Sequence, residues 1–322
     1  MKVEIDVYNT KGRVSEKCPI CKGEEYSIAS TTIRGGVQCD VRHCKKCTVY
    51  YLPPGFADSD KLIQEYSTNY TYKPSLGSLL GTDYDPYLAY VSYIDHLLDK
   101  KTTSLLDIGA GPGHFISHVK DRVLNVEAVE LHPGQADYCR KTHNITVHED
   151  LISALDMTEK FDIVCAFSVL EHVPDPVDFL TKAMSFVKPG GVLFIEVPNS
   201  QDPLLSLYDV PNYSNFYFRP EHLYDFNKQS LAKLFETAGF RNHTLDLHQA
   251  YSLTNHIHWA TNGKGQESTK VGYRFTFPSP PKSPSPLADR LQEFFDDIDR
   301  QYRDFLKKEG YADMLLSIVE KP

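Results

Sequence analysis

The stretch SLLDIGAGPGHF, residues 104–115, decides the fold class of this 322-residue chain. It begins as a short apolar strand and continues into a turn that contains Gly109, Gly111 and Gly113. Glycine at a strand-to-helix junction permits a tight turn and lets a ligand approach the backbone closely. The stretch therefore predicts a strand–loop–helix unit whose loop binds a ligand.

Strands and helices alternate along the rest of the chain. The segment FDIVCAF (161–167) is a nearly continuous apolar run, which is typical of a strand buried on both faces of a parallel sheet. The alternation predicts an α/β fold with a doubly wound, Rossmann-like, mostly parallel sheet. Further strands are expected at 125–130, 192–197, 241–249 and 314–319, and helices within 86–100, 173–191, 227–240 and 291–306.

An acidic residue, Glu130, ends the strand at 125–130. In an open α/β sheet this carboxylate lies beside the glycine loop, where it can accept hydrogen bonds from both ribose hydroxyls of an adenosine. Dinucleotides use the pattern G-x-G-x-x-G, because their pyrophosphate binds at the helix N-terminus. Here Asp107 precedes the first glycine, and its carboxylate would repel a phosphate but tolerate an ammonium group. The loop therefore favours an adenosine cofactor with an aminoacyl group.

With this pattern of an acid followed by G-x-G-x-G, residues 105–250 resemble the class I S-adenosylmethionine-dependent methyltransferases. The resemblance implies a seven-stranded sheet and S-adenosylmethionine as the methyl donor, with Glu130 binding the ribose and Asp150 meeting the adenine amino group. The segments FDIVCAFSVLEHVPDP and KPGGVLFIEVPN also match the family. Its remaining implied cofactor contacts are Asp107, Gly109, Gly111, Gly113, Leu151, Phe167 and Ser168.

Two pairs of cysteines mark the N-terminal part of the chain: Cys18 with Cys21, and Cys44 with Cys47, with 22 residues between the pairs. Four thiolates at such spacing suit tetrahedral zinc, and an intervening hairpin can absorb the long gap. Because protein atoms fill all four positions, the metal is expected to be structural. His43 could replace Cys44 as a ligand, and reduced thiols without metal are the alternative interpretation.

We expect three parts along the chain: a zinc-ribbon-like head at 1–55, a connector at 56–85 and a methyltransferase domain at 86–322. Between the last two strands, at about 250–310, lies a long insertion rich in aromatic residues. One hypothesis is that it caps the substrate pocket, with Asn255 or His256 reaching the ligand. A dimer interface or a cover for the sheet edge is the alternative.

The head and core together resemble bacterial small-molecule methyltransferases, among them sugar C-methyltransferases that act on nucleotide-linked sugars. The segment 216–235 matches their Glu-His pair with Glu221 and His222, although their large C-terminal domain is absent and the head differs. Histidine is a usual acceptor for a substrate proton. We therefore name His222, oriented by Glu221, as the candidate base, and His172, after the strand at 161–167, as the second candidate.

Composition and charge narrow the acceptor. The formal net charge is −9, so the chain has no surplus of cations for nucleic-acid phosphates. The first ten residues have no apolar run typical of a secretory signal, and no apolar run approaches the roughly 20 residues that span a bilayer, so we expect a cytoplasmic protein. The prediction is methyl transfer to a small polar acceptor such as a sugar, a nucleotide-linked sugar or a related metabolite. An RNA methyltransferase with a zinc head and a non-catalytic cofactor-binding module are the alternatives.

Overall fold

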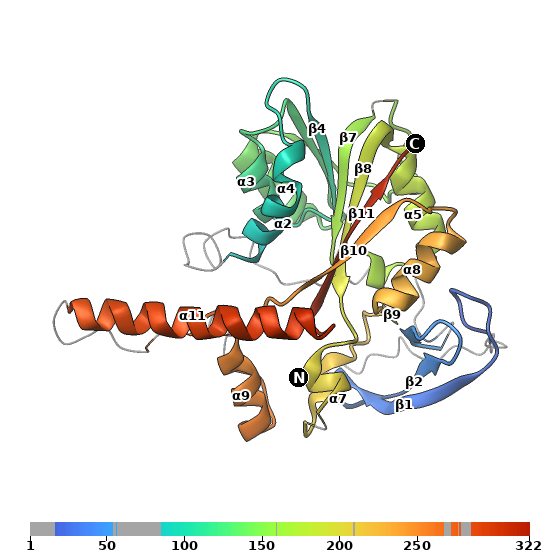
Figure 1. Ribbon diagram of the computed structural model, residues 1–322. Coiled ribbons are helices and arrows are strands. Elements are labelled where there is room, and N and C mark those ends of the chain that lie inside the picture. Colours follow the sequence, from blue (N-terminus) through green and yellow to red (C-terminus); the bar gives the residue numbers. More distant parts are fainter. Residues whose placement is uncertain are drawn as a thin grey trace.

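The computed structural model describes residues 17–53, 56, 85–158, 160–208, 210–266, 272–275, 277 and 285–322. Most of the expected connector at 56–85 and most of the proline-rich stretch 277–286 lie outside these described residues. A seven-stranded sheet and a four-stranded sheet form the framework (Figure 1). Within the described ranges, no helix combines the length and the apolar character needed to cross a membrane.

The large sheet confirms the predicted doubly wound, mostly parallel fold. Its strand order is β10-β11-β8-β7-β4-β5-β6, and β11 runs antiparallel to both of its neighbours. The parallel pairing of β4 through β8 places the ends of these strands at one common edge. The strands are β4 (Ser104–Ile108), β5 (Asn125–Val129), β6 (Thr146–His148), β7 (Phe161–Phe167), β8 (Val187–Pro198), β10 (His243–His248) and β11 (Met314–Glu320).

Helices cover both faces of this sheet (Figure 1). On β7, Ile163 and Cys165 pack in the core beneath one face, whereas Val164 and Ala166 pack in the core beneath the other. This alternation follows from the two-residue period of a strand. The first core lies under α2 (Pro86–Ile94), α3 (His114–Val119) and α4 (Pro133–His143), and the second under α5 (Pro176–Ser185) and α8 (Lys228–Thr237).

Strand β8 begins earlier than the apolar pattern predicts. Pro189, Gly190 and Gly191, which end the segment 173–191 where a helix is expected, belong to the strand itself. The pairing shifts register here, because Phe161 faces Val187 whereas two residues later Ile163 faces Val192. A Cβ on Gly191 would lie 2.6 Å from the carbonyl oxygen of Asp162. The bulge therefore depends on glycine.

The small sheet joins the head to the catalytic part of the chain. A hairpin of β1 (Tyr26–Ile33) and β2 (Val37–Cys44), linked by η2 (Arg34–Gly36), pairs with β3 (Tyr50–Tyr51). The fourth strand, β9 (Tyr224–Asp225), comes from the later segment that carries the Glu-His pair. The backbone N–H of Arg34 also donates to the carbonyl of Phe218 at 2.8 Å. The head is thus fixed directly against residues 216–225.

The insertion between β10 and β11 contains α9 (Leu253–Asn262) and the long α11 (Pro286–Lys308). Figure 1 shows α11 crossing one end of the large sheet and extending beyond it. Helix α9 packs on α7 (Tyr213–Tyr217) through the rings of Trp259 and Tyr213, whose centroids are 4.9 Å apart. The insertion is therefore a helical structure built on the end of the sheet.

Candidate cofactor and acceptor site

The glycine loop follows β4 and has the conformation that glycine favours. Gly109, Gly111 and Gly113 have φ values of 76°, 56° and 87°. A Cβ on Gly109 would lie 2.4 Å from Cγ2 of Val169, and one on Gly113 would lie 2.5 Å from the ring of His143. Side chains are excluded at both positions, so the backbone of the loop remains close to neighbouring groups.

The carboxylate of Glu130 is held against this loop. It is 1% exposed, and its Oε2 accepts a hydrogen bond from the N–H of Gly111 at 2.8 Å. Its Oε1 accepts from the N–H of His132 at 2.7 Å. A carboxylate oxygen can accept more than one hydrogen bond, so these contacts leave capacity for ribose hydroxyls. The geometry fits the adenosine part of the expected cofactor.

Asp107 lies in β4, next to the loop, and is 2% exposed. Burial and, to a smaller extent, the negative charge of Glu130 together raise the pKa of its carboxyl to about 7. Its ionised form needs a compensating positive charge. The ammonium and sulfonium groups of S-adenosylmethionine supply positive charge of this kind.

The other predicted cofactor contacts occupy different surroundings at the same edge. Asp150 and Leu151 follow β6 and are exposed, as residues at the rim of a ligand site can be. The ring of Phe167 stacks on Tyr90 with centroids 4.9 Å apart, so this side chain belongs to the core. Ser168 is exposed and has a φ of 52°, which turns the chain sharply after β7.

A cluster of two histidines and a carboxylate lies beyond β7. Glu171 and His172, in η5 (Leu170–His172), meet His222, which precedes β9. Their ligand-type N and O atoms all lie within 4.8 Å of one another. The structure therefore brings together the two histidines that the sequence proposes and adds Glu171. Val169, three residues before His172, packs against Gly109 of the glycine loop.

Both histidines have fixed ring orientations. Nδ1 of His172 donates to the carbonyl of Glu221 at 2.9 Å, since a carbonyl can only accept. Nδ1 of His222 lies 3.4 Å from Oδ1 of Asp225. The partner that orients His222 is thus Asp225, and Glu221 contributes its backbone to His172 while its side chain is exposed.

Burial dominates the electrostatics of this cluster. It lowers the pKa of His222 well below the usual value near 6.5, and it lowers the pKa of His172 as well. It also raises the pKa of Glu171 to about 8 and that of Asp225 to about 8. Both imidazoles are therefore neutral near pH 7 and can accept a proton or bind a cation.

The four cysteines form a second, separate cluster in the head. Sγ of Cys18 lies 3.6 Å from that of Cys47, Sγ of Cys21 lies 3.5 Å from that of Cys44, and all four lie within 4.8 Å. Tetrahedral zinc with bonds of about 2.3 Å separates its sulfurs by about 3.8 Å, so the thiols fit this metal. His43 stacks on Tyr50 at 4.2 Å instead, outside the cluster.

Polar residues of the insertion contact one another and the end of β10. Nδ1 of His256 lies 2.5 Å from the hydroxyl of Tyr302, and its Nε2 lies 3.4 Å from Nε2 of Gln249. Both ring nitrogens thus face groups of the insertion and of the end of β10. His256 is 6% exposed, so these groups enclose its ring. The capping of the substrate pocket by the insertion stays a prediction.

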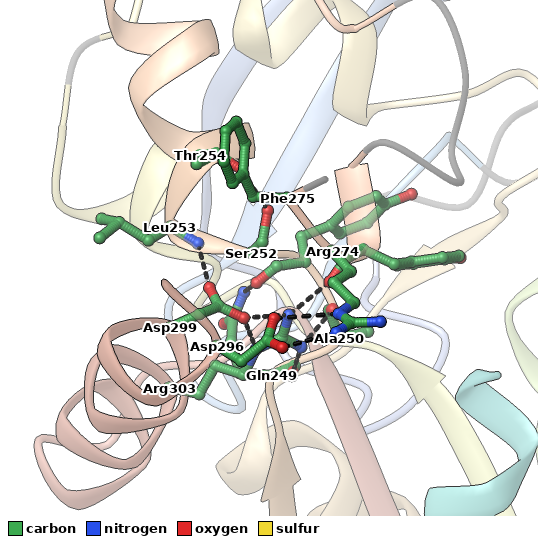
Figure 2. Close-up of polar contacts among 12 residues, drawn as sticks. Gln249, Ala250, Ser252, Leu253, Thr254, Arg274, Phe275, Asp296, Asp299 and Arg303 are labelled. Atoms are coloured by element: carbon green, nitrogen blue, oxygen red, sulfur yellow. Dashed lines mark hydrogen bonds and ion pairs between the residues drawn. The ribbon is translucent and has the colours of Figure 1, made fainter. Parts of the chain in front are cut away.

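A cavity of about 730 Å³ opens between α2 and α11. Charged residues on its wall pair with one another: Arg274 donates to Asp296 at 2.9 Å, and Arg303 donates to Asp299 at 2.7 Å (Figure 2). None of the site residues predicted from the sequence lines this cavity. Both ion pairs lie within the insertion, and that of Arg274 with Asp296 joins two of its segments.

Sequence reasoning missed three buried carboxyls, although each left a signal. Glu171 directly precedes His172, and Asp225 follows His222 by three residues. Glu196 is an acid inside the apolar strand β8, and its Oε2 accepts from the hydroxyl of Ser168 at 3.1 Å. A carboxyl within an apolar run is costly to bury, and such a residue is a candidate for function.

A family model described as a methyltransferase domain matches residues 84–245, which is half of the chain. This chain belongs to that methyltransferase family. It is an S-adenosylmethionine-dependent methyltransferase, as the glycine loop and Glu130 predict.

Individual relatives of this methyltransferase cover parts of it. A ubiquinone biosynthesis O-methyltransferase of Pseudomonas fluorescens (strain Pf0-1) is 28% identical over 127 residues, which are 37% of this chain and 54% of the relative. The chain spans about half the length of the curated relatives it matches.

Among solved structures, an amino pentose methyltransferase from Micromonospora echinaspora, with S-adenosylmethionine bound, shows 22% identity and a TM-score of 0.32, covering 34% of this chain and 49% of that one. A methyltransferase from Thermotoga maritima, described as a possible histamine N-methyltransferase, shows 18% identity and a TM-score of 0.46, covering 73% and 89%.

Proposed function

We propose that this methyltransferase transfers the methyl group of S-adenosylmethionine to a small polar acceptor such as a sugar, a nucleotide-linked sugar or a related metabolite. One observation supports this most: two histidines, His172 and His222, lie together, and the segment of His172 packs through Val169 against Gly109 of the glycine loop. A polar acceptor needs such groups for orientation or for proton removal. The resemblance to small-molecule methyltransferases points to the same acceptor class.

The cofactor supplies an activated methyl group on a sulfonium, so the chain's own residues have to place the acceptor and manage its proton. In this proposal Glu130 binds the ribose, Asp107 compensates the positive cofactor, and Asp150 and Leu151 lie at its adenine end. His222 removes the acceptor's proton or anchors the acceptor, and His172 lines the same space. The four cysteines hold a structural zinc that takes no part in methyl transfer.

The test is a turnover screen with S-adenosylmethionine over nucleotide sugars and polar metabolites, read by mass spectrometry of the products. We expect a methylated product in one of these classes. His222→Gln should lower turnover by at least tenfold while cofactor affinity stays within about twofold, because the cofactor's contacts come from other loops. Methylation of RNA with no small acceptor turned over would replace this proposal.

If His172→Gln is the inactive variant and His222→Gln is normal, the principal role moves to His172. Full activity in both variants would show that neither histidine acts on the acceptor. His258→Gln, which changes a histidine on α9 outside the cluster, is the matched control. It should keep both turnover and cofactor affinity.

A further inference from the structure

The carboxyl group of Glu171 has an unusual environment for an acid. It is 1% exposed, and neither of its oxygens has a hydrogen-bond partner among the described residues. The backbone at this position is nevertheless fixed, since the carbonyl of Glu171 accepts from the N–H of Leu223 at 2.8 Å. A buried acceptor without a partner costs about 1–3 kcal/mol, and native structures normally satisfy such groups. We therefore expect a hydrogen-bond donor or a cation to occupy the space next to the oxygens of Glu171.

Two imidazoles stand next to this carboxyl. Nε2 of His172 lies 3.7 Å from Oε1 of Glu171, and the rings of His172 and His222 have centroids 4.9 Å apart with planes at 82°. Ligand atoms on one metal ion are commonly separated by about 3–4 Å, given bonds of about 2.0–2.2 Å. One cation can therefore reach all three side chains after small side-chain movements.

The groups behind the histidines also suit metal binding. His172 donates from Nδ1 to the carbonyl of Glu221, which leaves Nε2 with its lone pair in the neutral ring. Nδ1 of His222 faces the carboxyl of Asp225 at 3.4 Å. A carbonyl or carboxylate behind the second nitrogen is the usual way in which proteins orient metal-binding histidines.

The donor set and its exposure indicate the class of cation. Two imidazoles and one carboxylate with further positions open suit divalent transition metals, whereas Mg²⁺ and Ca²⁺ prefer oxygen ligands alone. The side chain of His172 is 39% exposed whereas that of Glu171 is 1% exposed. The cluster is therefore closed on the Glu171 side and accessible at His172.

We propose that Glu171, His172 and His222 bind one divalent transition-metal cation, at a site separate from the four cysteines. The open positions of this cation bind an oxygen of the acceptor, and His222 anchors the acceptor through the metal. This role for the cation rests on the proposed function. The binding of the cation itself does not, because it depends only on the three ligands and the groups behind them.

Calorimetric titration with Co²⁺ alone tests the proposal on the full chain. The protein should first carry one zinc in the head, verified by elemental analysis before and after the titration. We expect one Co²⁺ per chain for the unmodified protein, and an affinity at least tenfold weaker for Glu171→Gln and for His172→Gln. The His172→Gln change is at a partly exposed side chain, so this variant remains informative if Glu171→Gln does not fold.

The matched control is His248→Gln, since His248 is a half-buried histidine at the end of β10, outside the cluster. It should keep the Co²⁺ affinity of the unmodified protein, and all variants should bind S-adenosylmethionine normally. The proposal would be overturned if the zinc-loaded protein bound no Co²⁺. It would also be overturned if the Glu171→Gln and His172→Gln variants bound Co²⁺ as tightly as the unmodified protein does.

The acceptor screen gives an independent result. If small acceptors are methylated but no Co²⁺ binds, the metal site is refuted and the proposed function stands. If one Co²⁺ binds at the three ligands but no small acceptor is methylated, the metal site stands and the proposed function is refuted. The two failures are therefore distinguishable.

Discussion

At the scale of single residues, Glu130 is the most direct test of cofactor binding. Its two oxygens are fixed by backbone N–H groups of Gly111 and His132 and can still accept from the ribose. Glu130→Ala should weaken S-adenosylmethionine binding by about 1–3 kcal/mol, because the ribose hydroxyls lose their acceptor. Isothermal calorimetry measures this change. Glu149→Ala, which removes an exposed acid paired with Arg140, is the control and should leave the affinity unchanged.

Asp107 gives cofactor binding a pH dependence. Its pKa of about 7 reflects burial first and the charge of Glu130 second. A cofactor with net positive charge prefers the carboxylate, so binding releases a proton below this pKa. Affinity should therefore rise by up to about tenfold per pH unit between about pH 6 and 7 and then level off. Calorimetry across about pH 6–8 measures the slope, which Asp107→Asn should flatten.

The same pKa has the opposite consequence for the ligand-free fold. A carboxyl whose folded pKa is raised stabilises the protein fully below its ordinary pKa near 3.8, and this contribution is lost as the pH rises through about 7. Cofactor binding and cofactor-free stability should therefore respond to pH in opposite directions. An affinity that stays constant over this range in the unmodified protein would contradict the assignment of Asp107.

At the scale of elements, Gly109 in the glycine loop is held by both its left-handed backbone and its close packing, and Gly190 in β8 serves as the comparison. Gly190 has a φ of 77° and open space around it, so Gly190→Ala should cost only about 1–2 kcal/mol of unfolding free energy. Gly109→Ala adds a contact of 2.4 Å with Val169 and should cost about 1–3 kcal/mol more. Urea denaturation measures both. Val169→Ala in the Gly109→Ala background should recover part of the loss, and equal costs at the two glycines would refute the packing argument.

Arg303 holds the insertion to the end of the large sheet. Its guanidinium donates to the carbonyl of Gln249 at 2.8 Å and to Asp299 at 2.7 Å, and Asp299 in turn accepts from the N–H of Leu253 at 2.6 Å (Figure 2). Arg303→Gln should therefore increase amide hydrogen exchange in α9 without changing it in β7. Arg300→Gln, at an exposed ion pair, is the control, and unchanged exchange in α9 would contradict this role.

At the scale of the whole molecule, the head is joined to the segment of His222 through the pairing of β3 with β9. Cys44→Ser removes one ligand of the proposed zinc site and should lower the zinc content of the purified protein, because a site with three thiolates binds less tightly. Hydrogen exchange should then increase in β1 and β2 and also in β9. S-adenosylmethionine affinity should stay within a few-fold of the unmodified value. Full zinc content with unchanged protection of β9 would contradict the link.

Sequence patterns predicted the large sheet well, but they predicted the cluster around His172 and His222 only in part. The run 161–167 and the alternation around it have local periods, so the strands and the glycine loop could be placed from the sequence. The contacts of Glu171, Asp225 and His222 depend on two segments about 50 residues apart, and no local pattern specifies how they meet. The extra length of β8 depends on a glycine bulge that apolar counting misses.

The pairing of β3 with β9 means that the small sheet cannot be completed until residues 224–225 have been synthesised. The Tyr50–Tyr51 edge leaves the ribosome about 170 residues before its partner at Tyr224–Asp225. At about 5–20 residues per second, the nascent head waits about 10–35 s with one strand edge unpaired. Unpaired edges invite pairing between different chains. Translation speed across residues 52–225 therefore sets how long neighbouring nascent chains can join through their heads.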